Sequence, residues 1–535
     1  MKTMINSIIL ASCLALPLAS CSDSDAAPEQ KDWSTTTYFN SSDAAAQDTY
    51  YKPAVGYVGD PMPFFDPVAG DFKVLYLQDF RPNPEGTYHP IWGVSTKDAA
   101  HYTALGELVS CGTLKSQDAA IGTGSTIYDE ASKLYYTFYT GNKYKPTGDE
   151  SAQAVMVATS PDFKTWTKDR TFLLKGQDFG YDKNDFRDPF VFKGDDGKFH
   201  MLVSTKKSGK GSLAEFVSDD LKNWTDNGVF MTMMWDRFYE CPDLFKMGDY
   251  WYLVYSEIHH AVRRVQYFKG RTLDELKACT ANDVARWPDA HEGFLDSRGL
   301  YAGKTASDGT NRYLWGWCPT RSGKDNTAVG ASPAEPEWGG NLVCYKLIQH
   351  EDGTLTLGQV DAVSEKYNQD VAVEVKESQN MTEADGTYTL AGNAELPDAY
   401  MLMGRLGNHN KISFTVTTSN EWDKFGISMV RGSDSKKYYT MVVNPEDENN
   451  RKVNFEEQGV EGKGFIAGID GYVFARPADN VYNITIYTDN SICVMYINDV
   501  CSYTNRIYGI QKNCWSINSY NAANVKISNL KISQY

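Results

Sequence analysis

Five similar segments in the first two thirds of the chain constrain its fold more than any other feature. Each begins with a turn rich in Asp, Gly or Ser and continues into a short aromatic and aliphatic strand, and each follows another short, often apolar piece. They read "AGDFKVLYLQ" (69–78), "EASKLYYTFY" (130–139), "DDGKFHMLVS" (195–204), "MGDYWYLVYS" (247–256) and "DGTNRYLWGW" (308–317). Hairpins this short are not stable alone, and their spacing is typical of blades. The pattern predicts a five-bladed β-propeller, with a β-sandwich of coincidental hairpins as the alternative.

The pattern of apolar and polar residues changes after "VSEKY" (363–367). Alternating segments such as "KISFTVTTS" and "YNITIYTD" follow, separated by Gly, Asn and Asp turns, and this favours a C-terminal β-sandwich. The fold class is therefore all-β. The predicted divisions are a signal peptide at 1–21, a tether and N-terminal extension at 22–50, the propeller at 51–365 and the sandwich at 366–535.

The N-terminus has the form of a bacterial export signal. Lys2 precedes an apolar stretch from Ile5 to Leu18, which is too short to span a membrane comfortably. "LASC" (18–21) has the form of a lipobox, in which Cys21 is lipidated; the alternative is an ordinary cleaved signal with an incidental cysteine. With one lipid anchor, the domains are expected on a membrane surface, periplasmic or at the cell surface.

Charge and composition indicate which classes of ligand and partner the protein can bind. The formal net charge is −17, without a basic stripe, and this argues against nucleic acid. The 34 Tyr, 12 Trp and 24 Phe suit a β-rich protein and also a protein that stacks sugar rings. The ten Cys form no CxxC pair and the eight His do not cluster, so we predict neither a metal nor a cofactor. The sequence leaves a Cys493–Cys501 disulfide open.

Carboxylates precede a proline in three of the five units. Asp60 stands before Pro61, Asp188 before Pro189, and Glu240 one residue ahead of "CP". Since proline favours the first position of a strand, each acid is expected at the start of an inner strand, at matching places of the repeat. All three would then meet at one end of the central channel. One Asp-Pro alone is more often a turn, but three at matching places indicate a functional cluster because like charges repel.

Two carboxylates that face a sugar ring are the apparatus of glycoside hydrolysis. One protonates the leaving oxygen, and the other attacks the anomeric carbon or activates water. In a retaining enzyme the two carboxyl groups lie about 5–5.5 Å apart. The expected partner is therefore an oligo- or polysaccharide substrate.

Several motifs together resemble glycoside hydrolase family 32, the β-fructosidases (invertases, levanases and inulinases). The family's "NDPNG", "RDP" and "EC" motifs are similar to "GDPMP" (59–63), "FRDP" (186–189) and "ECPD" (240–243), in the same order. Secondary matches are "LYLQ" (75–78), "WGVSTKD" (92–98), "TGST" (123–126), "YTGN" (139–142) and "WGGNL" (338–342). The resemblance implies a five-bladed propeller, a following sandwich and hydrolysis of fructosyl linkages of the sucrose, levan or inulin type.

The resemblance also implies roles for individual residues. Asp60 would be the nucleophile, Glu240 the general acid and base, and Asp188 the transition-state stabiliser. Arg187 would hold the same sugar, and Cys241 would help to set the environment of Glu240. The further candidates for the substrate pocket are Gln78, Trp92, Thr123 and Asp243, and Trp92 also suits a structural place in a blade.

The chain departs from the family pattern beside these residues. Gly59 replaces an Asn, Met62-Pro63 replaces Asn-Gly, and Gly122 replaces an aromatic residue. The resemblance implies that these positions line the sugar pocket, and the departures leave open an unusual fructoside or another sugar as the substrate. Two rival interpretations remain: a family 43-like propeller glycosidase that acts on arabinan or xylan, and a non-catalytic surface glycan-binding protein.

Overall fold

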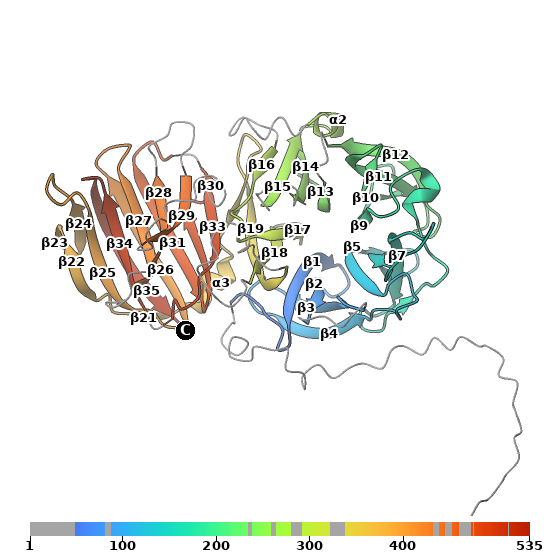
Figure 1. The fold of residues 1–535 in the computed structure, drawn as a ribbon, viewed down its shortest axis with the longest axis horizontal. Helices are drawn as coiled ribbons and strands as arrows, with labels where there is room; N and C mark the ends of the chain where they lie inside the picture. Colours follow the sequence, from blue (N-terminus) through green and yellow to red (C-terminus); the bar gives the residue numbers. More distant parts are fainter. Residues whose placement is uncertain are drawn as a thin grey trace, which may run out of the picture.

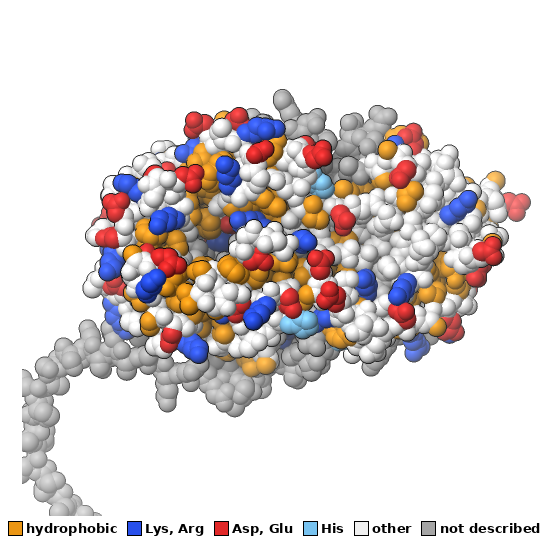
Figure 2. All heavy atoms as spheres, turned by 180° about the vertical axis from the view of Figure 1, so that it is seen from behind, with side chains coloured by type: hydrophobic (Ala, Val, Ile, Leu, Met, Phe, Trp, Pro, Cys, Tyr) orange, Lys and Arg blue, Asp and Glu red, His pale blue; other side chains and the backbone are white. Residues whose placement is uncertain are grey.

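The computed structural model is all-β, with a ring of sheets joined to a two-sheet domain (Figure 1). Figure 2 shows the opposite face, on which acidic and basic side chains are interspersed. The structure describes residues 49–80, 87–233, 238–257, 264–279, 292–320, 338–431, 438–444, 452–458, 472–474, 476–511 and 513–535. Cys21 and the proposed signal lie outside the described residues.

The ring consists of five blades, each a sheet of four antiparallel strands. Blades 1 and 2 contain β1 (Tyr57–Asp66), β2 (Asp71–Asp79), β3 (Ile91–Thr96), β4 (Thr103–Val109), β5 (Ala120–Asp129), β6 (Leu134–Asn142), β7 (Gln153–Ser160) and β8 (Thr167–Lys168). Blades 3 and 4 contain β9 (Phe186–Lys193), β10 (Phe199–Lys207), β11 (Lys210–Ser218), β12 (Thr225–Thr232), β13 (Glu240–Met247), β14 (Tyr250–Glu257), β15 (Arg264–Gly270) and β16 (Glu292–Phe294). Blade 5 contains β17 (Tyr301–Ser307), β18 (Arg312–Pro319), β19 (Gly340–Gln349) and β20 (Leu355–Gly358).

The five repeated sequence segments form the second strand of each blade. These strands are apolar along most of their length because each blade packs against a neighbour on both faces, as the run of buried residues from Tyr252 to Glu257 in β14 shows. The turn before β14 places Gly248 at a φ of 54°, a left-handed conformation that glycine adopts without strain. The prediction of a five-bladed propeller is confirmed.

The ring closes between the first and the last blade. Val58 of β1 pairs with Gly340 of β19, so blades 1 and 5 form one continuous hydrogen-bonded sheet. The inner strands β1, β5, β9, β13 and β17 surround the centre of the ring (Figure 1). Short helices lie outside this pattern: η2 (Gly176–Phe179), α2 (Leu273–Lys277) and α3 (Asp361–Lys366).

The C-terminal domain is a sandwich of two antiparallel sheets, as predicted. One sheet contains β21 (Gln369–Val371), β23 (Met381–Ala384), β24 (Thr387–Ala391), β26 (His409–Thr418), β31 (Val481–Asp489), β32 (Ile492–Ile497), β33 (Cys501–Arg506) and β35 (Asn524–Gln534). The other contains β22 (Val375–Gln379), β25 (Ala399–Arg405), β27 (Lys424–Arg431), β28 (Tyr438–Asn444), β29 (Lys452–Gln458), β30 (Tyr472–Val473) and β34 (Cys514–Tyr520). In β26 every second residue is buried, and Ile412, Phe414 and Val416 join the core between the sheets.

The two domains share a buried polar interface. Arg506 of β33 donates to the carbonyl oxygens of Cys318 and Pro319 and to Oδ1 of Asn341, at 2.9, 3.0 and 2.6 Å. On the propeller side, Oδ2 of Asp296 accepts from the hydroxyl of Thr504 at 2.8 Å. Because these groups are buried and hydrogen-bonded across the boundary, they hold the sandwich in one orientation on blade 5.

The described cysteines are all free thiols. Cys493 lies opposite Asn505 and Cys501 opposite Ile497, so the disulfide that the sequence left open does not form. In the described part of the chain, no helix has both the length and the apolar character needed to cross a membrane.

Candidate active site

A cavity of about 270 Å³ opens where the inner strands of the propeller begin. The three predicted acids, Asp60, Asp188 and Glu240, all line it, together with Arg187 and Thr123. Each comes from an inner strand: β1, β5, β9 or β13. The sequence therefore anticipated which acids the fold brings together.

A β-bulge near the start of each inner strand turns these side chains into the cavity. In β9, Arg187 pairs with Ser204, and the next regular pair is Phe190 with Leu202, so two residues of β9 oppose one of β10. The same shift occurs in β1, β13 and β17, and β5 carries one at Thr123. The bulge breaks the alternation of the strand and points adjacent residues toward the centre.

The register corrects one expectation, that the three acids occupy matching places. At the bulge, each of the strands β1, β9 and β13 has two unpaired residues. Asp188 is the first unpaired residue of β9, and Asp60 is the second unpaired residue of β1. Glu240 is the last paired residue before the bulge of β13. Asp188 has a left-handed φ of 56°, and its counterpart in β13, Cys241, has a φ of 51°. Three successive positions of one motif thus supply the acids, which spreads them around the cavity.

Both oxygens of Asp60 accept hydrogen bonds. The indole N–H of Trp317 donates to Oδ1 at 2.8 Å, and the hydroxyl of Thr123 donates to Oδ2 at 2.6 Å. Two donors stabilise the charged carboxylate and restrict its rotation. This environment suits a nucleophile.

Glu240 lies between a cation and a phenol. Nη2 of Arg187 donates to Oε1 at 2.9 Å, and the hydroxyl of Tyr301 donates to Oε2. The guanidinium also stacks on Phe238, 3.9 Å from the ring centre, and bonds Asp185 at 2.8 Å. Arg187 is thereby fixed in place, where it stabilises Glu240 whenever that group is ionised.

Asp188 is buried, with 4% of its surface exposed. Burial raises the pKa of Asp188 to about 7; Arg187, whose Nε lies 4.0 Å from Oδ2, opposes this rise, and the neighbouring Glu240 adds to it. Oδ2 also accepts from the backbone N–H of Cys241 at 2.9 Å. The carboxyl group is therefore held rigidly and titrates close to neutral pH.

A buried lysine lies deeper in the ring. Nζ of Lys304, on β17, donates to the carbonyl oxygen of Gly124 at 2.9 Å, and burial lowers the pKa of Lys304. The attraction of Asp243, Asp188 and Asp60 opposes that lowering, so this cation offsets part of the repulsion among the acids.

Three pocket candidates do not line the cavity. The amide of Gln78 donates to the carbonyl oxygen of Val55 at 2.5 Å, and Trp92 on β3 packs edge-on against Phe80. Asp243 is buried and accepts from the backbone N–H and hydroxyl of Thr305 at 2.7 and 2.6 Å. Gln78 lies on β2 and Trp92 on β3, whereas Asp243 is the first paired residue after the bulge of β13.

Other lining residues were not singled out from the sequence. Trp338 and His89 stack with ring centres 4.2 Å apart, and Tyr88 and Asn142 complete the wall. "WGGNL" signalled the region of Trp338, but its contact with His89 joins segments 249 residues apart (338 minus 89), which no local pattern encodes. A Cβ at Gly59 would lie 2.1 Å from Cη2 of Trp338, so the indole occupies the space beside this departure.

No group of three or more His, Cys, Asp or Glu side chains that could hold a metal ion occurs among the residues described. The carboxylates of the cavity instead have Arg187, Thr123, Trp317 and Tyr301 as partners.

Two family models match the chain in succession. The model described as "Glycosyl hydrolases family 32 N-terminal domain" matches residues 50–360. The model described as "GH32, BT1760-like, C-terminal domain" matches residues 353–532. Together they extend over both folded domains.

Curated relatives are similar over part of the chain. An insoluble β-fructofuranosidase isoenzyme of Arabidopsis thaliana is 26% identical over 310 residues, which are 52% of this chain and 50% of the relative. A sucrose-6-phosphate hydrolase of Vibrio alginolyticus is 27% identical over 220 residues, 39% of this chain and 41% of the relative. The chain thus spans about half the length, or less, of the curated relatives it matches.

Solved structures share the whole arrangement. An exo-inulinase from Aspergillus awamori superposes with a TM-score of 0.68 at 16% identity, covering 93% of this chain and 99% of that one. A sucrose-6-phosphate hydrolase from Lactobacillus gasseri gives 0.67 at 18% identity, covering 92% and 94%. At identities of 16% and 18%, the similarity to these structures shows that this chain has the same fold.

Proposed function

Because the chain belongs to glycoside hydrolase family 32, we propose that it hydrolyses fructosyl linkages of the sucrose, levan or inulin type by a retaining mechanism. One observation carries the proposal: Asp60, Asp188 and Glu240 line a single cavity, each with its own hydrogen-bond partners. Relatives named as invertase and inulinase support the substrate class.

In the first step, Glu240 donates a proton to the leaving oxygen while an oxygen of Asp60 bonds to the anomeric carbon. The bond to the leaving group breaks, and a fructosyl ester of Asp60 forms. Arg187, 2.9 Å from Oε1, stabilises the charge that Glu240 acquires as it gives up its proton. The bonds from Trp317 and Thr123 keep Asp60 aimed at the sugar.

In the second step, Glu240 takes a proton from water, and the resulting hydroxide attacks the anomeric carbon and releases Asp60. Positive charge develops on the sugar ring in both steps. Asp188 accepts hydrogen bonds from hydroxyl groups of that sugar and stabilises the charge, and Arg187 contributes a donor beside it. Each step inverts the configuration of the anomeric carbon, so the product has the same anomeric configuration as the substrate.

Turnover of defined sugars tests the proposal. The native protein and an Asp60→Asn variant are incubated with sucrose, levan, inulin and arabinan, and products are separated by chromatography. We expect fructose or fructo-oligosaccharides from the native protein alone. Release of arabinose would move the activity to the family 43-like alternative, and binding without turnover would support the non-catalytic alternative.

We also propose that the protein is an exported bacterial lipoprotein, anchored to a membrane surface through Cys21, on the periplasmic side or at the cell surface. The support is the "LASC" motif after the apolar stretch and the polar residues that follow. Incorporation of labelled palmitate in the native protein, but not in a Cys21→Ala variant, tests this. Equal labelling of both would refute it.

A further inference from the structure

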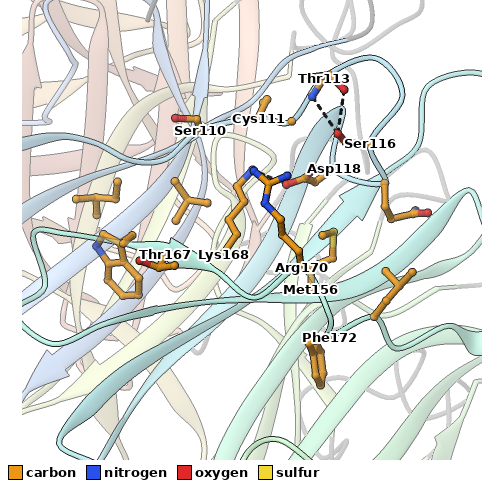
Figure 3. Close-up of a pocket in the computed structure, with 16 residues that line it drawn as sticks. Ser110, Cys111, Thr113, Ser116, Asp118, Met156, Thr167, Lys168, Arg170 and Phe172 are labelled. Carbon is orange, nitrogen blue, oxygen red and sulfur yellow. Dashed lines mark hydrogen bonds and ion pairs between the residues drawn. The ribbon is translucent and has the colours of Figure 1, made fainter. Parts of the chain in front are cut away.

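A second cavity of about 500 Å³ lies between blades 1 and 2, larger than the cavity that holds the three acids. Its walls come from the end of β4, the connection 110–118 and the segment 166–173 around β8. Figure 3 shows Lys168 and Asp118 at its centre, with Phe172 on one side and Thr113 and Ser116 on the other. Nothing in the proposed mechanism uses this cavity.

The second cavity is separated from the catalytic cavity by one layer of residues. Sγ of Cys111, which lines the second cavity, lies 2.9 Å from the carbonyl oxygen of Tyr88, which lines the first. Beside this contact, the amide of Gln117 donates at 3.0 Å to the carbonyl oxygen of Gly141, the neighbour of Asn142 in the catalytic wall. The two cavities are therefore neighbours, on either side of this layer.

The lining combines apolar surface with hydroxyl and charged groups. Trp166, Phe172 and Leu173 supply apolar and aromatic faces, and Leu173 is 38% exposed. Sugar rings present C–H faces to such side chains and hydroxyls to polar ones. The composition therefore fits a carbohydrate.

The cavity is lined by charges of both signs, from Lys168, Arg170 and Asp118 (Figure 3). Nζ of Lys168 lies 2.5 Å from Oδ2 of Asp118, so its charge is already compensated. The hydroxyl of Tyr139 donates to the same carboxylate at 3.2 Å. Sugar hydroxyls both donate and accept hydrogen bonds, so they can bond the carboxylate and the cations of this lining.

We propose that this second cavity is a distal binding site for a carbohydrate polymer, occupied by units of the chain whose scissile bond lies in the catalytic cavity. The inference rests on the proposed function for the identity of the polymer. It predicts that the enzyme distinguishes long substrates from sucrose, because a disaccharide held by the three acids has no units left to cross the Tyr88–Cys111 layer.

The test uses variants that change the second cavity and leave the acids untouched. Thr167→Trp places an indole at an exposed lining position and fills the cavity, and Trp166→Ala removes an aromatic wall. Trp422→Ala is the matched control, since Trp422 is 37% exposed on the sandwich, far from the cavity in sequence and fold. Thermal unfolding of each variant checks that the fold is retained.

Kinetics on sucrose, inulin and levan give the first readout. We expect Thr167→Trp and Trp166→Ala to raise the half-saturating polymer concentration about three- to tenfold, the effect of losing one aromatic contact. The kcat/KM for sucrose should stay within about twofold, and Trp422→Ala should change neither. Equal changes on sucrose and polymer, or no change on polymer, would overturn the proposal.

Affinity electrophoresis in gels that contain inulin, levan or arabinan gives a readout independent of turnover. The Asp60→Asn variant should be retarded by the polymer that the site binds, and adding Thr167→Trp should abolish most of that retardation. Retardation that survives Thr167→Trp would refute the distal site. If the native protein cleaves no fructoside while this loss is still seen, the proposed reaction fails and the binding site stands.

Discussion

Asp188→Asn separates the chemical role of Asp188 from its effect on stability. The change removes the charge and the titration but keeps the size of the side chain. Asn also tolerates the left-handed φ of 56° at this position, so backbone strain should not increase. Its amide oxygen can still accept from the N–H of Cys241, which lies 2.9 Å from Oδ2.

The size of the stability effect follows from the pKa. Burial raises the pKa of Asp188 from 3.8 to about 7. When the folded pKa is raised, stability is complete below the unfolded pKa and is lost as the pH rises through the folded pKa. The raised pKa of Asp188 therefore lowers the free energy of unfolding by about 4 kcal/mol above pH 7. At pH 5, where the group is protonated in the folded protein and ionised in the unfolded chain, the raised pKa lowers it by roughly 1 to 2 kcal/mol.

In the Asp188→Asn variant, residue 188 does not titrate, so it contributes no pH-dependent loss to the free energy of unfolding. The free energy of unfolding of the variant, relative to the native protein, should increase by about 2 to 3 kcal/mol between pH 5 and pH 8. Denaturant unfolding at both pH values measures this difference. At the same time kcat should fall about a hundredfold or more, since the group that stabilises the developing charge has lost its own charge.

Asp385→Asn is the matched control. Asp385 also has a left-handed φ, 50°, but is exposed on the sandwich, so its variant should change neither activity nor the pH dependence of unfolding. A stability difference for Asp188→Asn that stays constant from pH 5 to pH 8 would refute the raised pKa. Unchanged kcat would refute the proposed role of Asp188.

Three further substitutions test the site and the domain interface. Gly59→Ala should displace the indole of Trp338, 2.1 Å from the new Cβ, and raise KM for sucrose severalfold, as initial rates would show; unchanged KM would contradict the tight contact. Trp317→Phe removes the N–H bonded to Asp60 and should lower kcat about tenfold or more, with KM changed less; equal kcat would show the bond to be dispensable. Arg506→Met leaves buried carbonyl oxygens unpaired and should lower the free energy of unfolding by about 3 kcal/mol in urea titrations, whereas activity per folded molecule persists.

The sequence alone determined the architecture and the identity of the acids. Repeated hairpins with continuous apolar strands can bury both faces only when blades pack side by side, and the alternating residues of the last third can bury only one. Proline after Asp60 and Asp188, and near Glu240, indicated the inner strands because proline has no N–H to donate to a ladder, although each proline lies at or directly after the bulge and not at the first residue of its strand. These are local properties, and the pattern of residues encodes them.

Only the tertiary structure decided how the acids are arranged and what surrounds them. Asp60, Asp188 and Glu240 follow one motif in the sequence but take three successive positions at the bulges, and this depends on pairing with the neighbouring strand. Gln78, Trp92 and Asp243 were candidates by motif, and the structure places none of them among the residues that line the cavity. Contacts across the ring, between segments far apart in the chain, result from closing five blades into one circle, and no local pattern specifies them.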